Sequence, residues 1–353
     1  MSGPEPAGRR FRAPVVALGL AMLMLALAVV SVGVGPVPIS PGKTLRVLVH
    51  ALPGVGAAID VTDVPPEDAE IILSIRPPRV VVAVLVGVAL ALAGTIMQGF
   101  FQNPMADPYI IGVSSGAGFG ATLAVALGLH QRVLGMSMLS AFAFAGSVGV
   151  TLLVYTLARR GGRVPTGTLL LTGVAVGAMV SAVTSLMLLY RTNDLKPLVQ
   201  WLMGSLAGRQ WSHALTILPY VAIGAPLALM YARDLNAMLA GDEPAMHLGV
   251  DVGRTRLALL VLAAALASAA VAVAGVIGFV GLVVPHISRL LVGPDHRRLL
   301  PVAALGGAVL LLIADLLSRT MPGFQEVPVG IVTSVLGCPF FLLLLCQSRQ
   351  TRF

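Results

Sequence analysis

Two apolar runs of membrane length lie on either side of a short polar hinge between Arg76 and Gly120. The first run ends near Gln98, and the Asn103-Pro104 pair interrupts the sequence before the second run begins. A helix needs about 20 apolar residues to cross a bilayer, and a soluble core has no need of two such runs in direct succession. The sequence therefore predicts a polytopic membrane protein.

The composition supports this interpretation. Of the 353 residues, 57% are hydrophobic and only 11% are charged, whereas soluble domains carry about 25% charged residues. The 39 glycines suit a membrane bundle, in which small residues let helices approach closely because lipid supplies no hydrophobic drive for association. The net charge of +8 comes from Lys and Arg in the loops between apolar runs, so we interpret it as a sign of topology rather than of nucleic-acid binding.

Ten apolar runs are candidates for membrane spans. They lie at about residues 15–34, 80–100, 108–128, 136–158, 168–190, 212–231, 255–274, 276–292, 300–318 and 327–346. With ten spans, most of the 23 basic residues fall on the side of the N-terminus, as the positive-inside rule requires. We therefore expect both termini to be cytoplasmic. Two runs touch at Gly275, where one long bent helix, and hence nine spans, is the alternative.

Two further segments are expected to remain outside the bilayer core. Residues 35–79 form the longest polar stretch, with a short interfacial helix, and residues 191–211 are too short to span. The strings 89–94 (ALALAG) and 270–275 (AVAVAG) resemble each other, as expected for an inverted-topology repeat. The predicted fold is an all-α polytopic membrane protein: a single transmembrane domain over residues 1–353, with about ten inverted-repeat-like transmembrane helices and short non-spanning helices.

The sequence shows no motif for catalysis. Gly42-Lys43-Thr44 resembles the tail of a nucleotide-binding loop, but position 37 is Val rather than Gly. The six histidines show no spacing for a zinc site, and we find no nucleophile with a matching base. We expect no enzymatic activity, cofactor or metal site on this chain.

Asp315 and His286 are polar residues inside apolar runs. A buried carboxylate in lipid is costly unless it is paired or hydrated, so Asp315 is either a proton relay or a structural acceptor for Ser, Thr or a helix N-terminus. We favour the structural role because no second intramembrane acid lies nearby in sequence. His286 follows Pro285, and we expect it to be a hydrogen-bonded structural group rather than a ligand.

Residues 233–256 form a patterned cytoplasmic segment. Leu235, Met238 and Leu239 share one apolar helical face, a break follows at Gly241, and residues 243–248 can begin a second short helix. A helical pair that stands out of the membrane usually contacts a partner. The alternative is a solvated connector.

Ten short blocks between about residues 70 and 345 carry a family resemblance. They are residues 76–79 (RPPR), 94–98 (GTIMQ), 103–108 (NPMADP), 112–116 (GVSSG), 201–204 (WLMG), 247–249 (HLG), 278–286 (GFVGLVVPH), 293–297 (GPDHR), 314–315 (AD) and 326–337 (EVPVGIVTSVLG). The chain resembles the FecCD-type permeases, the membrane subunits of ATP-driven importers for iron-siderophores, haem and cobalamin.

The resemblance implies a permease subunit in the bacterial inner membrane that forms a homodimer with the pathway along the dimer axis. Two ATPase subunits would hydrolyse ATP on the cytoplasmic side, and one soluble substrate-binding protein would dock outside. The implied cargo is an iron chelate, siderophore-iron or haem, with cobalamin as the alternative. A proton-coupled secondary transporter that uses Asp315 is the rival from another class, but it has no use for a cytoplasmic docking segment.

The resemblance also assigns candidate site residues. Docking of the binding protein falls to Arg76, Arg79 and Arg319, which we expect at the exposed outer surface, where arginines pair well with carboxylates. The ATPase-docking region at 233–254 contains Leu239, Glu243, His247, Leu248 and Gly249. The cytoplasmic gate contains Asn103, Met105, Thr166 and Gly167, although the family often has Leu at 105 and Ser at 167. Under this resemblance Asp315 is structural.

Overall fold

The computed structural model describes residues 12–51, 54, 56, 59–129, 131–133, 136–159, 164–190, 195–321 and 326–350. The helices are α1 (Ala13–Gly33), α2 (Pro41–His50), α3 (Pro66–Glu70), the π-helix η2 (Ile71–Ile75), α4 (Arg76–Phe100), the 3-10 helix η3 (Pro108–Ile111), α5 (Val113–Ala126), α6 (Met138–Ala158), α7 (Thr166–Leu189), α8 (Leu195–Leu202), α9 (Trp211–Met230), α10 (Ala232–Met238), α11 (Asp242–His247), α12 (Val252–Ala274), α13 (Val280–Val292), α14 (His296–Thr320) and α15 (Val329–Gln350). Two strands of two residues each, β1 (Arg132–Val133) and β2 (Met136–Ser137), form an antiparallel pair.

Each of the ten predicted apolar runs contains a helix. Seven helical stretches in the described part of the chain are long and apolar enough to cross a membrane, the longest being the continuous stretch Pro66–Phe100. Three apolar helices are shorter: Val113–Ala126, Val280–Val292 and the Val329–Leu343 part of α15. The prediction of an all-α multi-pass membrane protein with short non-spanning helices is confirmed.

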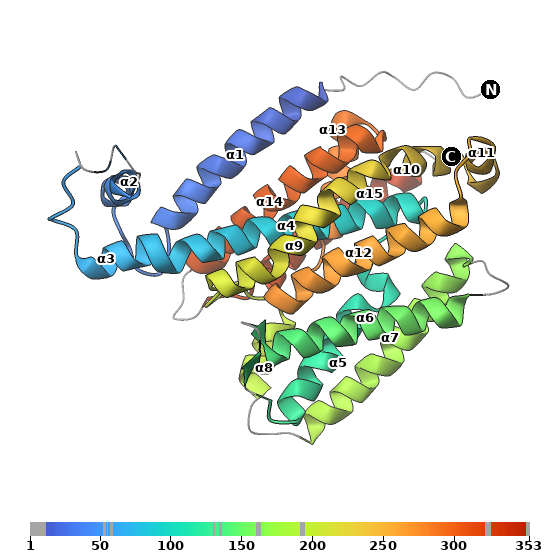
Figure 1. Cartoon of the computed structure of the whole chain (residues 1–353), viewed down its shortest axis with the longest axis horizontal. Helices are drawn as coiled ribbons and strands as arrows, with labels where there is room; N and C mark the ends of the chain where they lie inside the picture. The colour runs from blue at the N-terminus through green and yellow to red at the C-terminus, as the bar shows by residue number, and fades with distance from the viewer. Residues whose placement is uncertain are drawn as a thin grey trace.

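Helix α4 runs through the centre of the bundle (Figure 1). Most of its residues are buried, and it contacts α9, α12, α13 and α14. Small residues permit these contacts: a Cβ on Gly94 would collide with the backbone carbonyl of Gly281, and one on Gly87 with that of Gly307. Close approach of backbones is the expected way to gain packing energy in lipid.

Helices α5, α6 and α7 form a group beside this centre (Figure 1). Gly116 and Gly120, four residues apart, form a glycine ridge on α5 that lies against α6: a Cβ on Gly116 would meet the carbonyl of Gly146, and one on Gly120 would meet that of Phe142. A pair of buried hydroxyl groups, Ser147 of α6 and Ser268 of α12, joins the group to the centre at 2.6 Å. The ridge thus acts in helix packing.

The chain turns sharply at Gly275, so the alternative of one long bent helix is wrong. Gly275 has a φ of 75° and ends α12, and Phe279, with a φ of 68°, precedes α13. The Ser205 amide donates to the carbonyl of Ala274 at 2.8 Å. A Cβ at Gly275 would also collide with the carbonyl of Trp201 in α8, so this position suits glycine for both its φ and its contact.

The two halves of the chain share a pattern of a long helix, a break and a short helix. Helix α4 is followed by η3 and α5, with Gly112 at a φ of 91° before α5, and α12 is followed by α13. The two breaks meet: the Tyr109 hydroxyl donates to the Ile277 carbonyl at 2.9 Å and accepts from the Ile277 amide at 3.3 Å. Broken helices of this kind are common in transporters. The similar strings differ in position, because Gly94 lies inside α4 whereas Gly275 ends α12.

Helices α2 and α3 form one end of the molecule, at the left of Figure 1. Ser40 caps α2 by accepting from the Lys43 amide at 3.4 Å. Arg46 binds both carboxylate oxygens of Asp63, at 2.8 and 2.7 Å. This hydrogen bonding lowers the pKa of the exposed Asp63 carboxyl.

Candidate functional site

The predicted helical pair is present and lies at the end of the molecule opposite α2 and α3 (Figure 1). It consists of α10 and α11, separated by a turn at Gly241 with a φ of 111°. Leu235 and Met238 are buried under the pair, as their shared face predicts, whereas Leu239 is exposed. The segment is therefore a folded element rather than a loose connector.

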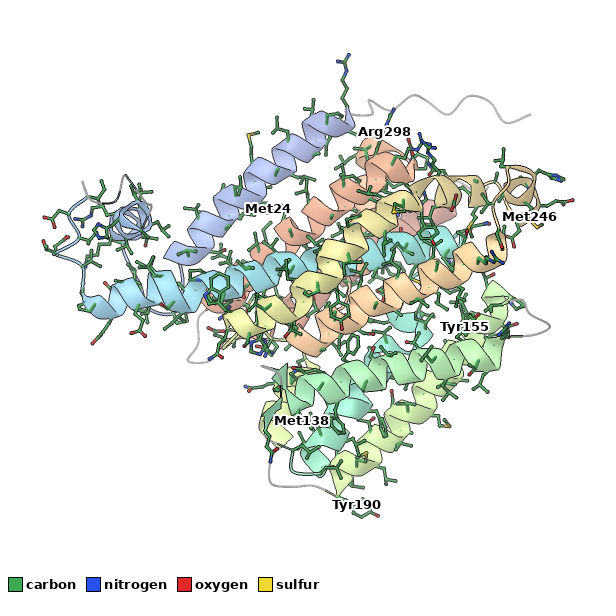
Figure 2. The ribbon with its side chains drawn as sticks, in the orientation of Figure 1. Met24, Met138, Tyr155, Tyr190, Met246 and Arg298 are labelled. Carbon is green, nitrogen blue, oxygen red and sulfur yellow. The ribbon has the colours of Figure 1, made fainter. Side chains whose placement is uncertain are left out.

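The outer face of this pair presents apolar side chains. All five candidate docking residues, Leu239, Glu243, His247, Leu248 and Gly249, are exposed. Leu248 is 73% exposed, and Met246, which the sequence analysis missed, is exposed beside it on α11 (Figure 2). Apolar side chains grouped on the end of a membrane protein mark an interaction surface. We call the exposed residues 239, 243, 244 and 246–249 the docking face.

Two polar contacts fix α10 to the bundle. The Asn236 side chain donates to the Asp295 carboxylate at 2.6 Å and accepts from the His296 amide at 2.8 Å, at the start of α14. Gln102, in the loop after α4, donates from its side-chain amide to the carbonyl of Met238. The docking face is thus joined to the ends of α4 and α14.

Arg256 forms a third connection. Its guanidinium donates to the Asp242 carboxylate of α11 at 2.8 Å, and it lies 5.8 Å from the ring centroid of Phe100, the last residue of α4. Only 18% of the Arg256 side chain is exposed, so both the ion pair and the cation–π contact are partly shielded from water. In the sequence, Arg256 is one of the basic residues on the predicted cytoplasmic side, and its place at the start of an apolar run was a possible signal of a further role.

A cavity of about 620 Å³ lies beside this connection. Its walls include Phe100, Tyr155, Pro165, Met246 and Arg256, and Figure 2 shows Tyr155 and Met246 at the same end of the molecule. The cavity brings the docking helix α11, the end of α4 and the segment before α7 to one place.

The candidate gate residues lie on two segments near this cavity. Asn103 and Gly167 are exposed, and Met105 and Thr166 are half-buried. The Asn103 side chain accepts from the Met105 amide at 2.9 Å and so shapes the loop after α4. Among the described residues no hydrogen bond joins this loop to Thr166 or Gly167. The gate assignment stays a prediction.

Arg79 and Asp315 form a buried charged cluster at the other end. Arg79 donates to the Asp315 carboxylate at 2.9 Å and to Glu326 at 2.8 Å. Arg319 lies 3.2 Å from the second oxygen of Asp315. Asp315 is fully buried, and its partners are arginines rather than the predicted hydroxyl group or helix N-terminus. Glu326 is a second carboxylate partner of Arg79, and the sequence did not predict this pair because the two residues lie 247 positions apart.

Arg76 and Arg319 also donate to carbonyls at the C-terminal end of α1 and just beyond it. The accepting carbonyls are those of Val32, Gly33 and Val37 for Arg76 and those of Ser31 and Val34 for Arg319. Such carbonyls lack helical partners and carry the negative end of the helix dipole, so cations satisfy them well.

The three candidate docking arginines are therefore buried, which corrects the expectation that they lie exposed. Arg76, Arg79 and Arg319 are 5%, 8% and 6% exposed. The sequence placed them at the outer end but gave no sign that α1 and Glu326 cover them. Their predicted docking role stays a prediction.

His286 packs edge-on against the Phe340 ring, with centroids 6.4 Å apart; the described residues give it no hydrogen bond.

Comparisons with known proteins agree with this architecture. The sequence model of the FecCD transport family matches residues 23–347. The chain is 48% identical to the cobalamin import system permease protein BtuC of Halobacterium salinarum over 81% of this chain and 76% of that protein. It is 46% identical to the hemin transport system permease protein HmuU of Yersinia pestis over 79% of this chain and 84% of that protein. A solved inward-facing structure assigned to the metal-chelate type of ABC transporter is 32% identical, with a TM-score of 0.79, and the match covers 95% of this chain and 99% of that one.

The charged cluster predicts a large effect of Asp315→Asn on stability. The change leaves Arg319 buried without a counter-charge and Arg79 with Glu326 as its remaining carboxylate partner, and breaking a buried ion pair in this way costs about 3–5 kcal/mol. We expect the thermal unfolding midpoint of the detergent-extracted protein to fall clearly. Asp63→Asn is the matched control, because Asp63 is exposed beside Arg46, and we expect a much smaller change. Equal midpoints for the two variants would contradict a structural role for Asp315.

Proposed function

The chain belongs to the FecCD transport family, and we propose from this premise how its two ends work in an ABC importer. It is a multi-pass permease subunit, as the family match over residues 23–347 and its import-permease relatives show. The observation that carries the proposal is the docking face on α10 and α11. An exposed apolar surface on a membrane protein, held to two spanning helices, is suited to a soluble partner that moves those helices.

We infer that this partner is an ATPase subunit on the cytoplasmic side. The chain has no nucleotide-binding loop of its own, so ATP hydrolysis belongs to another chain. The assembly contains two copies of this permease and two ATPases in the cytoplasmic membrane, with both termini of each permease inside. Leu239, Glu243, His247, Leu248 and Gly249 contact the ATPase.

A soluble substrate-binding protein docks at the opposite end, over residues 35–79 and the charged cluster. Arg76, Arg79 and Arg319 lie beneath that surface, and Glu326 remains 28% exposed at its edge. Glu326 is the internal carboxylate that an acidic side chain of the binding protein must replace in order to reach Arg79. Docking is therefore an exchange of carboxylates on a buried arginine.

The cargo is a metal chelate, and we propose an iron chelate such as siderophore-iron or haem. The hemin permease at 46% identity supports this choice. Cobalamin is the second candidate, because the relative at 48% identity is a cobalamin permease.

The connection at Arg256 explains how ATPase movement reaches the gate. A shift of α11 pulls on Asp242 and hence on Arg256, which lies against Phe100 at the end of α4. The gate loop with Asn103 and Met105 follows Phe100 directly, and Thr166 follows the cavity wall at Pro165. A movement at the docking face is thus transmitted to both predicted gate segments.

A proton-coupled transporter that uses Asp315 is less well supported. A proton carrier needs a carboxylate oxygen that is open to an entry path. Asp315 is fully buried, with Arg79 2.9 Å from one of its oxygens and Arg319 3.2 Å from the other. Such an arrangement is typical of a structural ion pair.

The cargo is tested with the native complex, extracted gently from its membrane with its ATPase and reconstituted in liposomes with its binding protein. We expect ATP-dependent uptake of haem or of a ferric siderophore, because the pathway belongs to a metal-chelate permease. Vesicles without ATP are the control. Uptake of cobalamin alone would establish the second candidate, and equal uptake with and without ATP would contradict the importer.

The docking face predicts the result of Leu248→Asp. The change places a charge in the apolar centre of the face but leaves the fold intact, because Leu248 is 73% exposed. We expect the ATPase to be lost on purification and ATP-dependent uptake to cease. Leu45→Asp is the matched control for ATPase retention alone, because Leu45 is 59% exposed on α2 at the other end, within the surface proposed for the binding protein. Retention of the ATPase by the Leu248 variant would refute the docking assignment.

Arg256→Ala separates docking from coupling. The docking face is unchanged, so the ATPase still co-purifies, but we expect the amount of cargo moved per ATP hydrolysed to fall about 5-fold or more. Arg254→Ala is the control, because the Arg254 side chain is 91% exposed and pairs only with Asp251 among the described residues. Normal cargo movement per ATP in the Arg256 variant would show that the connection does not transmit movement.

A further inference from the structure

A groove lies between α1 and α14 at the end of the molecule that carries the docking face. Its volume is about 690 Å³. Its lining residues are Arg12, Ala13, Pro14, Val15 and Ala17 from the start of α1, and Arg297, Arg298, Pro301 and Val302 from the first turns of α14. The two helices run side by side in the same direction, since Arg319 at the end of α14 binds carbonyls at the end of α1. Figure 2 shows Arg298 next to the N-terminal end of α1.

The three arginines at the head of the groove are poorly neutralised. Arg298 lies 3.9 Å from Asp295, and its side chain is 66% exposed. Arg12 and Arg297 make no side-chain hydrogen bond or ion pair with the described residues. Asp295 is itself engaged by the Asn236 side chain and the Arg297 amide. The head of the groove therefore carries an excess of positive charge that is accessible to a ligand.

Below the arginines, the groove has apolar walls and opens toward the membrane. Val15 of α1 is 63% exposed, and Leu18 and Met22 continue the exposed apolar side of the helix. Val302 and Ala17 belong to the small apolar cluster that joins α1 to α14 at the base of the groove. A cationic head followed by apolar walls along two membrane helices matches the shape and polarity of a lipid.

We propose that this groove binds one anionic phospholipid of the membrane. Arg12, Arg297 and Arg298 contact its phosphate headgroup, and its acyl chains lie along Val15, Pro301 and Val302. A water-soluble phosphate makes no use of the apolar walls, and a neutral lipid leaves the arginines without a counter-charge. Basic pockets between membrane helices are a known means of headgroup recognition. The topology proposed above places this lipid in the cytoplasmic leaflet, but the binding itself does not depend on that topology.

The position of the groove gives the lipid a structural effect. Asp295, two residues before Arg297, holds Asn236 of α10 at 2.6 Å. A lipid on Arg297 and Arg298 therefore stabilises the start of α14, to which the docking segment is attached.

The test adds dioleoyl-phosphatidylglycerol or dioleoyl-phosphatidylcholine to the full-length chain in detergent and measures lipid binding by native mass spectrometry and the thermal unfolding midpoint. We expect one tightly bound phosphatidylglycerol and a higher midpoint, with little effect of phosphatidylcholine. The variant Arg297→Gln with Arg298→Gln should bind phosphatidylglycerol about 10- to 30-fold more weakly, since each basic residue near the headgroup contributes about 1 kcal/mol. Val15→Trp, which fills the groove but keeps the charges, should also weaken binding.

Arg233→Gln with Arg254→Gln is the matched control, because it removes two exposed arginines from the same end of the molecule outside the groove. We expect it to bind phosphatidylglycerol as the parent chain does. Equal binding by the Arg297/Arg298 variant and this control would overturn the site. Equal protection by phosphatidylcholine would overturn headgroup recognition, and equal protection by inorganic phosphate would show an anion site without a lipid. Because uptake is not measured, the result does not depend on the proposed cargo.

Discussion

One buried carboxylate holds together the end of this permease that we propose to be the outer end. Asp315 on α14 binds Arg79 of α4 and Arg319 of its own helix, and these arginines reach Glu326 and the last carbonyls of α1. Four segments that are far apart in the chain are thereby joined through one set of charges. Separation of any of them would leave a charge unpaired in a medium that solvates it poorly. We therefore regard the outer end as the fixed part of the subunit.

The opposite end is built from weaker and more separable contacts. A short helical pair is held by the side chains of Asn236 and Gln102, by an ion pair at Arg256 and by the buried Leu235 and Met238, and it lies beside a cavity. The polar contacts join the pair to the loop after α4, to α12 and to α14, which suits the docking role proposed for it. The difference between the two ends fits a machine that is anchored on one side and driven from the other.

The sequence predicted those features that depend on local pattern. Ten apolar runs, the turn at Gly275 and the helical pair at 233–256 all follow from hydropathy and glycine placement over short windows. The partners of buried charges do not follow from short windows. Arg79 binds Asp315, which lies 236 positions further along the chain, and Glu326, which lies 247 positions further along. For the same reason the burial of the three outer arginines and the contact of Arg256 with Phe100 became visible only in the folded chain. Hydropathy shows where a helix lies in the bilayer but not which helix is its neighbour.

The hydroxyl group of Tyr109 links the two halves of the chain at their breaks. It occupies both the amide and the carbonyl of Ile277, so a side chain from the first half of the sequence supplies hydrogen bonds that the second half lacks at its break. If the two halves descend from a duplicated ancestor, they are no longer autonomous. The backbone groups of Ile277 in the second half are satisfied by Tyr109 of the first half, so this break needs both halves to be in place.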